Sequence, residues 1–456
     1  MNTFRTSSPV RRRTPALALL SLLQFLIAVD VTVVNVALPS IGAEFGADAA
    51  SLSWVVTGYT LVGGGLLLLG GRVTDLLGRR RMFLLGAALF AAASLLAGLA
   101  PNLEALIAAR FAQGAGEALA SPAALSLIAL LYPEPAERAK ALGIWGTISA
   151  GGLVVGVLLS GALTQLLHWR WIFGVNVPIT AVVLALTPLL VRPDGPRPRS
   201  GRLDVPGAVL LTAGPLTVVH GVIERNGAVL AAGCALLVAF VAVEARTKSP
   251  LVPLAFFAHR ARAVANAATV LLSAALSTTF YLLTLQLQNV LHLTPLQAGL
   301  AYLPFCGALL LGLTQVSRLI GALGLRGTAL LGLGATAAGL AWLTRLPDEG
   351  SFAVDVLPGM LGVATGMGIG LVALQNAALL DVTEADAGTA AGVQRSVDQL
   401  GGSLGLAVLV GVAAAQTAPQ VAGFRAAFAW ALLGVAVAAA GVWALRPGRG
   451  AAADRS

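Results

Sequence analysis

Charged residues are scarce in this chain: Asp, Glu, Lys and Arg make up only 11% of its 456 residues, against about 25% in a typical soluble protein. Aromatic residues are also few, at 6%, whereas 57% of the residues are hydrophobic and 53 are glycine. So little charge cannot cover the surface of a protein of this size in water, which excludes a soluble globular fold. The composition predicts an all-α membrane protein, with small residues where helices pack closely.

Other scarcities exclude further classes. The two cysteines, Cys234 and Cys306, each lie within an apolar run and can build neither a disulfide framework nor a metal site. The four histidines form no cluster. Neither Lys140 nor Lys248 follows a glycine, so the phosphate loop of ATP-driven proteins is absent. We therefore expect no enzyme, no metal and no cofactor.

Fourteen apolar runs separated by Pro, Gly or charge are each about long enough to cross a bilayer as a helix. They cover residues 16–38, 53–70, 82–99, 105–131, 142–163, 171–191, 205–222, 228–243, 264–285, 298–313, 328–346, 353–372, 396–415 and 422–445.

Basic residues set the expected topology. With the N-terminus in the cytoplasm, the cytoplasmic side receives every Lys and Arg except Arg110, Arg170, Arg225, Arg345 and Arg425. The even number of runs puts both termini inside. The basic residues behind the net charge of +9 are thus explained as topology signals, which argues against a nucleic-acid partner. We expect a multi-pass protein of the inner or plasma membrane.

A weak internal repeat predicts two halves. The segment Arg318–Arg326, between the tenth and eleventh runs, echoes Arg72–Arg79, between the second and third, but lacks the Asp. If the two segments correspond, each half has six spans and two further helices lie between them. We therefore expect a six-helix half at residues 1–200, an inserted pair at 201–260 and a second six-helix half at 261–456.

The charged segment Gly71–Arg81 is expected to be a tight hinge loop on the cytoplasmic side. Its two glycines permit sharp turns, and an Asp four residues before an Arg can pair with it on one helix face. The alternative is a plain positive anchor, which would explain the arginines but neither the Asp nor the paired glycines. The predicted gating residues are Gly71, Asp75, Gly78, Arg79 and Arg80.

Three charged residues fall inside apolar runs, where charge is costly and is by default a functional hypothesis. Asp30 and Arg110 come at similar depths, so an ion pair between them is possible. Burial raises the proton affinity of a carboxylate and a nearby guanidinium lowers it, so a movement between them would couple protons to conformation. A fixed structural ion pair is the alternative. Glu117, on the same helix face as Arg110, could carry a proton, bind a cationic substrate or line a wet cavity.

Other polar and small residues receive roles by position. We assign the substrate cavity to Asn35, Trp54, Tyr59, Gln113, Gln286 and Gln288. Arg395 and Asp398 come at the start of the thirteenth run and are expected at a solvated helix end. A track of glycines in the fifth run suits close helix packing across the two halves; these are Gly143, Gly146, Gly151, Gly152, Gly156 and Gly161.

Several motifs resemble those of the drug:proton antiporters of the major facilitator superfamily, in their fourteen-span subfamily. They are V-D-V-T-V-V-N-V-A-L-P at 29–39, W-V-V-T-G-Y at 54–59, the hinge at 71–81, R-F-A-Q-G-A-G at 110–116, W-R-W-I-F-G-V-N-V-P at 169–178 and L-Q-A-G-L-A-Y-L-P at 296–304. The resemblance implies two six-helix halves plus two central helices, with Arg110 in proton coupling. The fifth-span motif departs from the family pattern, because Gly156–Gly161 lacks its Pro and one Gly.

The resemblance implies a proton-coupled exporter of amphipathic small molecules such as drugs or antibiotics. It would be driven by the proton gradient and would work as a monomer in the lipid bilayer. The weakened fifth-span motif leaves room for a second function, uptake of a small metabolite together with protons. A third alternative is a membrane sensor that transports nothing.

Overall fold

The computed structural model is helical, and the part of the chain that it describes contains no strand. It describes residues 13–194, 203–380, 382, 387–415 and 420–445. Within them, 13 helices are long and apolar enough to cross a membrane, which confirms a multi-pass membrane protein. Both chain termini, whose sidedness the charge pattern predicts, lie outside the described residues.

The long helices follow one another with short connections. Their bounds are α1 Arg13–Phe45, α2 Ala49–Leu77, α3 Arg79–Gly98, α4 Leu103–Leu131, α5 Pro135–Leu166, α6 Trp171–Gly174, α7 Asn176–Leu190, α8 Val205–Ile223, α9 Gly227–Glu244, α10 Arg260–Leu285, α11 Pro295–Ala301, α12 Leu303–Leu343, α13 Leu357–Ala378, α14 Ala387–Ala414 and α15 Gln420–Trp443. A 3₁₀ turn (Leu254–Ala258) precedes α10, and π-helical turns follow α10 (Gln286–Val290) and precede α13 (Phe352–Val356).

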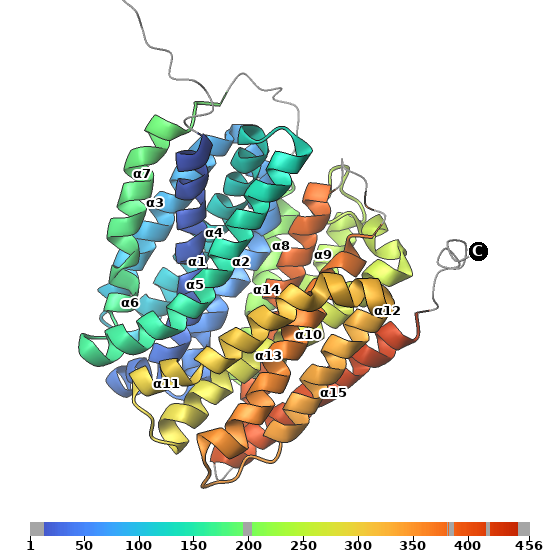
Figure 1. The fold of residues 1–456 in the computed structure, drawn as a ribbon. Coiled ribbons are helices and arrows are strands. Elements are labelled where there is room, and N and C mark those ends of the chain that lie inside the picture. Colours follow the sequence, from blue (N-terminus) through green and yellow to red (C-terminus); the bar gives the residue numbers. More distant parts are fainter. Residues whose placement is uncertain (1–12, 195–202, 381, 383–386, 416–419, 446–456) are drawn as a thin grey trace, which may run out of the picture.

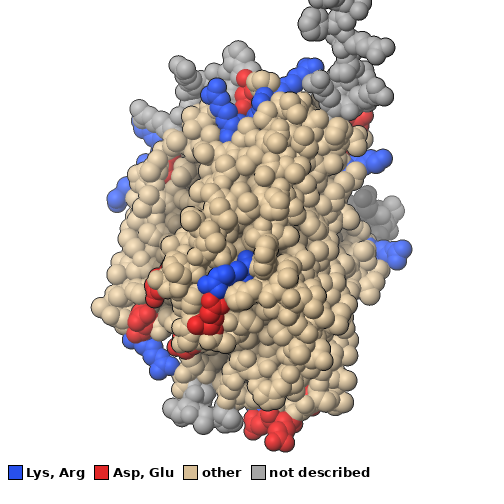
Figure 2. Space-filling view, turned by 90° about the vertical axis from the view of Figure 1, so that its left-hand side faces the viewer, with Lys and Arg blue, Asp and Glu red and all other residues tan. Residues whose placement is uncertain are grey.

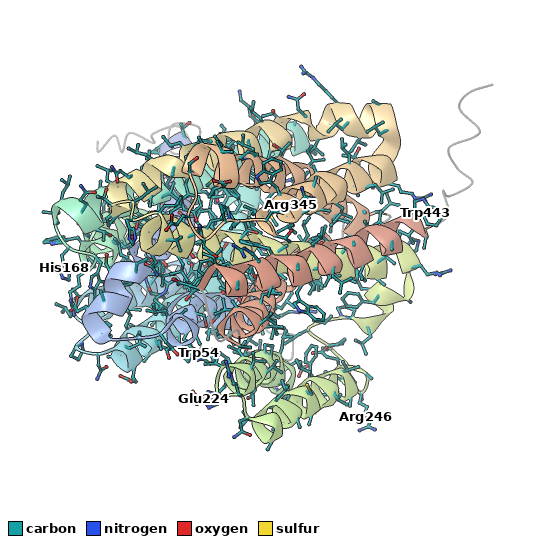
Figure 3. All side chains as sticks on the ribbon, turned by 90° about the horizontal axis from the view of Figure 1, so that it is seen from below. Trp54, His168, Glu224, Arg246, Arg345 and Trp443 are labelled. Carbon is teal, nitrogen blue, oxygen red and sulfur yellow. The ribbon has the colours of Figure 1, made fainter. Side chains whose placement is uncertain are left out.

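The helices form two groups that lie side by side (Figure 1). Helices α1–α7 make one group and α10–α15 the other. Helices α8 and α9 pack on each other as a hairpin, and α8 contacts α2 and α14. Seen from below, this hairpin stands at the edge of the molecule, with Glu224 and Arg246 near its two ends (Figure 3). The domain boundaries drawn from the sequence stay a prediction.

The tenth and eleventh predicted spans are joined by a very short turn. The label α12 covers two helices that meet at Gly324, where φ is +70° and the backbone is not helical. The predicted connection at Arg318–Arg326 is therefore present but shorter than expected, because the helix continues through Arg318 and one glycine makes the turn. The 13 apolar helices count this pair once, in the stretch Pro295–Leu343, so they are consistent with the 14 predicted spans.

The hinge is also much shorter than predicted. Helix α2 runs on to Leu77 and α3 begins at Arg79, so only Gly78 separates them. Its φ of +119° lies in a region that residues with a side chain rarely adopt. Gly71 and Asp75 are helical residues of α2 rather than loop residues. The prediction placed the end of the helix where charged residues end the apolar run. The helix itself continues beyond the lipid to Leu77.

Helix α14 begins at Ala387 rather than at Ser396. The expected solvated helix end at Arg395 and Asp398 is therefore wrong, because both residues lie well inside the helix. The first two turns, A-G-T-A-A-G-V-Q, are rich in small residues and too weakly apolar to mark a span. Asp398 accepts a hydrogen bond from the Ser273 hydroxyl of α10, so its carboxylate is held between two helices.

One face of α5 shows how the two helix groups meet. Toward its C-terminal end this face contacts α11: a Cβ on Gly161 would lie 2.6 Å from the Pro295 carbonyl oxygen. Gly143 and Gly146 lie on the same face by helical periodicity, yet a Cβ there would meet nothing among the described residues within 4 Å. Helix α5 thus contacts the second group near its C-terminal end, whereas Gly143 and Gly146 on its N-terminal half face no described neighbour.

The glycine track of α5 consequently serves two purposes. Gly152 and Gly156 bring α5 against α1, where added Cβ atoms would collide with the Phe25 carbonyl and the Thr32 hydroxyl. Gly161 alone of the six packs across the two groups. The expectation of a track that packs across the halves is therefore correct only for Gly161. The outer surface around these helices is covered mostly by uncharged residues (Figure 2), as contact with lipid requires.

Candidate functional site

The centre of the first helix group holds a buried ion pair. The Asp30 carboxylate of α1 pairs with the Arg110 guanidinium of α4, and their side chains are 0% and 1% exposed. The ion pair expected from the sequence is therefore present. Two charges taken out of water remain stable only with close pairing and further hydrogen bonds, so the neighbours of this pair matter.

Arg110 is held on three sides besides Asp30. Its Nε donates to the Val55 carbonyl oxygen of α2 at 2.8 Å, and its Nη1 also donates to Gln113 Oε1 at 2.9 Å. The guanidinium lies 4.3 Å from the centre of the Tyr59 ring, a cation–π contact. A fixed planar fork of donors can make these contacts together, so Arg110 ties α1, α2 and α4 to one point.

Asp30 has two further donors, both from amides. Gln113 Nε2 and Asn176 Nδ2 each donate to Asp30 Oδ1 at 3.1 Å. The Ser94 hydroxyl of α3 accepts from the same two amides, at 2.8 Å from Gln113 and 3.4 Å from Asn176. The site therefore draws side chains from α1, α3, α4 and α7, and a proton arriving on Asp30 would disturb all of them.

Close approach of α2 and α4 positions Arg110. A Cβ on Gly114 would collide with the Tyr59 carbonyl oxygen, so only glycine fits there. On the same side, a Cβ on Gly58 would collide with the Phe111 ring. The motif R-F-A-Q-G-A-G thus supplies both the guanidinium and the glycine that lets its helix come near enough to use it.

Glu117 of α4 has its partners in the second helix group. Its side chain is fully buried, and its Oε1 accepts a hydrogen bond from Gln399 Nε2 of α14 at 2.9 Å. The Arg395 guanidinium lies 3.6 Å from the same oxygen. Nearby, Thr60 of α2 and Ser403 of α14 are hydrogen-bonded. These contacts join the two groups at the level of Glu117.

The short hinge has a partner that the sequence did not indicate. Asp194, after α7, accepts hydrogen bonds from the backbone N–H groups of Arg79 and Arg80, both at 3.1 Å. It thereby caps the N-terminus of α3. Asp75 lies 3.9 Å from Arg79 in the pair expected from the sequence, across Gly78, with the Asp75 side chain 63% exposed.

The residues assigned to the substrate cavity do not lie in one place. Gln113 belongs to the Asp30 site and Tyr59 lies under Arg110. The amide of Asn35 donates to Val31 of its own helix, and Gln288 donates to the Val36 carbonyl at 2.7 Å, which connects the turn after α10 to α1. The Gln286 side chain is buried on the same turn.

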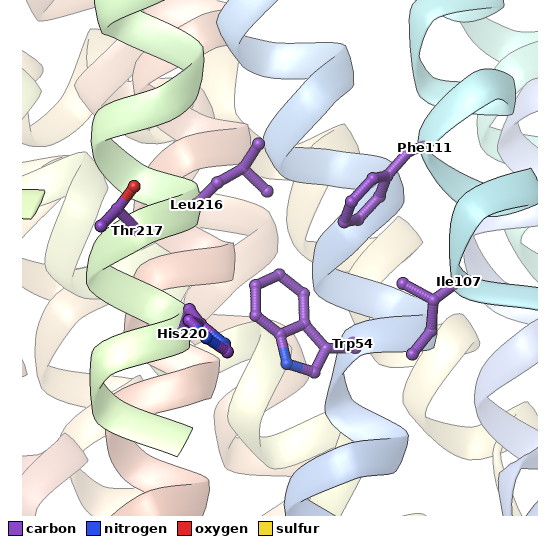
Figure 4. Close-up of a pocket in the computed structure, with 6 residues that line it drawn as sticks. All are labelled: Trp54, Ile107, Phe111, Leu216, Thr217 and His220. Carbon is purple, nitrogen blue, oxygen red and sulfur yellow. The ribbon is translucent and has the colours of Figure 1, made fainter. Parts of the chain in front are cut away.

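Trp54 lines a mostly apolar pocket of about 370 Å³ between α2, α4 and α8 (Figure 4). Its indole lies edge-on to the Phe111 ring, with the ring centres 6.1 Å apart, and 6.3 Å from the His220 ring. The pocket therefore lies between the first helix group and the inserted hairpin, away from the contact between the two groups.

Four residues of these contacts were missed from the sequence. Asn176 and Ser94 are neutral and lie in apolar runs. Asn176 is part of the quoted motif W-R-W-I-F-G-V-N-V-P, but no role was assigned to it. Gln399 is likewise a neutral residue inside a predicted run, and Arg395 was expected at a solvated helix end because α14 begins earlier than predicted. A polar residue inside an apolar run was the one signal that could have indicated them.

Comparison with known proteins identifies the family that this chain resembles. Residues 20–406 match the family model described as Major Facilitator Superfamily. The chain is 50% identical over 461 residues to a lincomycin resistance protein of Streptomyces lincolnensis, covering 98% of this chain and 94% of that protein. It is 38% identical over 474 residues to a puromycin resistance protein of Streptomyces alboniger, with 98% and 94% covered.

A cephamycin export protein of Amycolatopsis lactamdurans is 38% identical over 456 residues, with 97% of this chain and 93% of that protein covered. Among solved structures, the nucleoside transporter NupG superposes with a TM-score of 0.67 at 13% identity, covering 95% of this chain and 99% of that chain. That identity supports the fold alone.

Proposed function

The chain belongs to the Major Facilitator Superfamily, and from this premise we propose that it exports drug-like small molecules in exchange for protons. Relatives named for antibiotic resistance and for cephamycin export, aligned over nearly the whole chain, support export. The observation that carries proton exchange is the buried Asp30–Arg110 pair. The proton gradient supplies the energy, without a cofactor and without a catalytic step.

Proton exchange follows from the way Asp30 is solvated. In this structure a guanidinium and two amides donate hydrogen bonds to the carboxylate. Withdrawal of Arg110 would leave a carboxylate in an apolar site, where the protonated form is favoured. A movement of α4 relative to α1 therefore takes up or releases a proton, and the same movement can reshape the contact with the other helix group.

The contacts of α5 suggest the direction of loading. Its C-terminal end meets α11, whereas Gly143 and Gly146 on its N-terminal half face no described neighbour. The positive-inside pattern predicts that this N-terminal half lies toward the cytoplasm of a plasma-membrane protein. Substrate would therefore enter from the cytoplasm or the inner leaflet and leave when the α11 end opens. Its partners are the small molecule, protons and the surrounding lipid, and a single chain suffices.

Transport into proteoliposomes tests the proposal. Antiport moves substrate toward the acidic side, so vesicles with an acidic lumen should accumulate puromycin or a fluorescent dye beyond the level of protein-free vesicles. Collapse of the pH gradient with an ionophore should abolish the difference. Equal accumulation with and without the gradient would refute proton exchange.

The same vesicles distinguish the alternative of uptake by symport, for which the incomplete motif Gly156–Gly161 leaves room. Symport would carry substrate toward the alkaline side, so accumulation would require an alkaline lumen. A sensor that transports nothing would show no accumulation with either gradient.

A further inference from the structure

Glu117 is a second buried acid whose partners differ from those of Asp30. Both Gln399 Nε2, at 2.9 Å, and the Arg395 guanidinium, at 3.6 Å, approach the same oxygen, Oε1. The other oxygen, Oε2, is buried and has no hydrogen-bond partner within the described part of the chain. Such an unpartnered oxygen costs free energy, so the site would be completed by a ligand that donates hydrogen bonds.

Other unpartnered polar atoms lie around this oxygen. Gln399 Oε1 is buried and makes no hydrogen bond among the described residues, and the buried Tyr59 hydroxyl interacts with Glu117. A Cβ added to Gly63 would lie 3.2 Å from Glu117 Oε2 and 3.5 Å from Gln399 Oε1. Both acceptor oxygens therefore face the spot where Gly63 has no side chain, one contributed by each helix group.

We propose that Glu117 Oε2 and Gln399 Oε1 bind the protonated amine of a substrate at the contact between the two helix groups. This inference rests on the proposed export function and adds the substrate class, an organic amine with an apolar body. The cation would pair with Oε2, the oxygen that Arg395 does not approach. The Arg395 side chain is 43% exposed whereas Glu117 is fully buried, so part of the charge of Arg395 is screened by solvent and a second cation can be accommodated.

The geometry favours an amine over a metal ion. Ca²⁺ takes six to eight oxygen ligands and Mg²⁺ six in a near-octahedral arrangement, whereas three oxygens with a guanidinium beside them are present here. An ammonium group needs only two or three acceptors. Glu117 and Asp30 have different hydrogen-bond partners, and Tyr59, whose ring lies under Arg110, stands between the two acids.

The test compares an amine with its neutral acetylated form. Binding of puromycin and of N-acetylpuromycin is measured on the full-length protein in nanodiscs, below the pH at which the amine loses its proton. Glu117→Gln should raise the Kd of puromycin about ten-fold or more and leave that of N-acetylpuromycin within about two-fold. Glu104→Gln, an exposed acid on the same helix, is the matched control and should change neither.

A second variant keeps the charge. Gly63→Ala places a methyl group in front of the two oxygens and should weaken puromycin more than N-acetylpuromycin, with thermal unfolding showing that both variants fold. Equal weakening of the two compounds by Glu117→Gln, or no binding of either by the wild type, would overturn the amine site. Amine binding that depends on Glu117 without transport driven by a pH gradient would instead overturn the proposed exporter and leave the site standing.

Discussion

Asp30 accepts hydrogen bonds from three side chains that belong to α4 and α7, so its charge is stabilised by groups that must move together. Arg110 contributes the only positive charge among them. Loss of one neutral amide would leave the pair intact, whereas a change in either charged residue alters what the site can do with a proton.

We expect Asp30→Asn to abolish transport driven by a pH gradient while the protein stays folded. An asparagine is close in size to Asp and its oxygen can still accept from Gln113 or Asn176, but it cannot take up a proton. Proteoliposome transport measures the loss, and substrate binding in nanodiscs serves as the control. Transport at the wild-type rate would remove Asp30 from the coupling.

The transport rate of Arg110 variants should depend on how many hydrogen-bond donors the new side chain keeps. Lysine keeps the charge but is a single point donor, so it cannot hold Asp30, the Val55 carbonyl and Gln113 at once. We expect Arg110→Lys to retain a reduced transport rate and Arg110→Ala to retain none. If lysine and alanine were equally inactive, the geometry of the fork, and not its charge alone, would be required.

Single residues were predictable from the sequence where their charge contrasts with an apolar run. Asp30, Arg110 and Glu117 stand out in this way, and the ion pair between the first two is present. Asn176 and Gln399 do not stand out, because a neutral amide is cheap enough in a membrane helix to occur for many reasons. Their partners depend on which helices touch, and the spacing of residues within one run does not contain that information.

At the scale of helices, contact between α2 and α4 sets the position of Arg110. Gly114→Ala would push its helix away from the Tyr59 carbonyl, and we expect lower thermal stability and a lower transport rate. Gly143→Ala on α5 is the matched control, because its Cβ would meet no described atom within 4 Å. It should be neutral or raise stability by up to about 1 kcal/mol, the gain in helix propensity. Equal effects of the two would refute the close packing.

The connection between α1 and α2 should make stability depend on pH. Asp48 caps α2 by accepting from the Ser51 backbone N–H at 2.8 Å, and hydrogen bonding by Ser51 lowers the pKa of Asp48 below its ordinary 3.8. A lowered pKa means that the cap stabilises the fold above about pH 3.8 and is lost as the pH falls through the lower, folded value. Asp48→Asn, which caps without titrating, should lack this loss.

Thermal unfolding in detergent at a series of pH values measures the difference. At neutral pH the Asn variant should match the wild type, whereas Asp48→Ala should be less stable by about 1 kcal/mol. An identical fall in stability of the wild type and Asp48→Asn in acid would contradict the role of the cap.

Helix boundaries were the least predictable elements, for a physical reason. Hydropathy indicates where a chain can lie in lipid, but helices continue into water when their residues favour helix. Helix α2 passes through Asp75 to Leu77, and α14 begins before Arg395. The hinge glycine was predicted correctly at Gly78, since a turn there needs a positive φ. The capping Asp194 could not be found, because it comes from beyond α7, more than 100 residues away.

At the scale of the whole molecule, the sequence was sufficient for the class of fold because each span must be long, apolar and helical. It was insufficient for the conformation. Glycines at Gly143, Gly146 and Gly161 look alike in the sequence, yet one packs against the second helix group and two face open space. This difference shows that α5 meets the second group near its C-terminal end in this structure, and transport requires that such contacts alternate between the two ends.

Cysteine labelling can follow that alternation. In a variant without Cys234 and Cys306, we expect Gly146→Cys to react rapidly with a membrane-impermeant maleimide, because a Cβ there would meet no described atom within 4 Å. Gly161→Cys should react slowly, since it packs against the Pro295 carbonyl, provided that the protein tolerates the change. Conditions that open the α11 end, such as substrate with an opposed pH gradient, should slow the first reaction and speed the second. Parallel changes at both positions would show a general loosening of the helices and would contradict exchange between two closed ends.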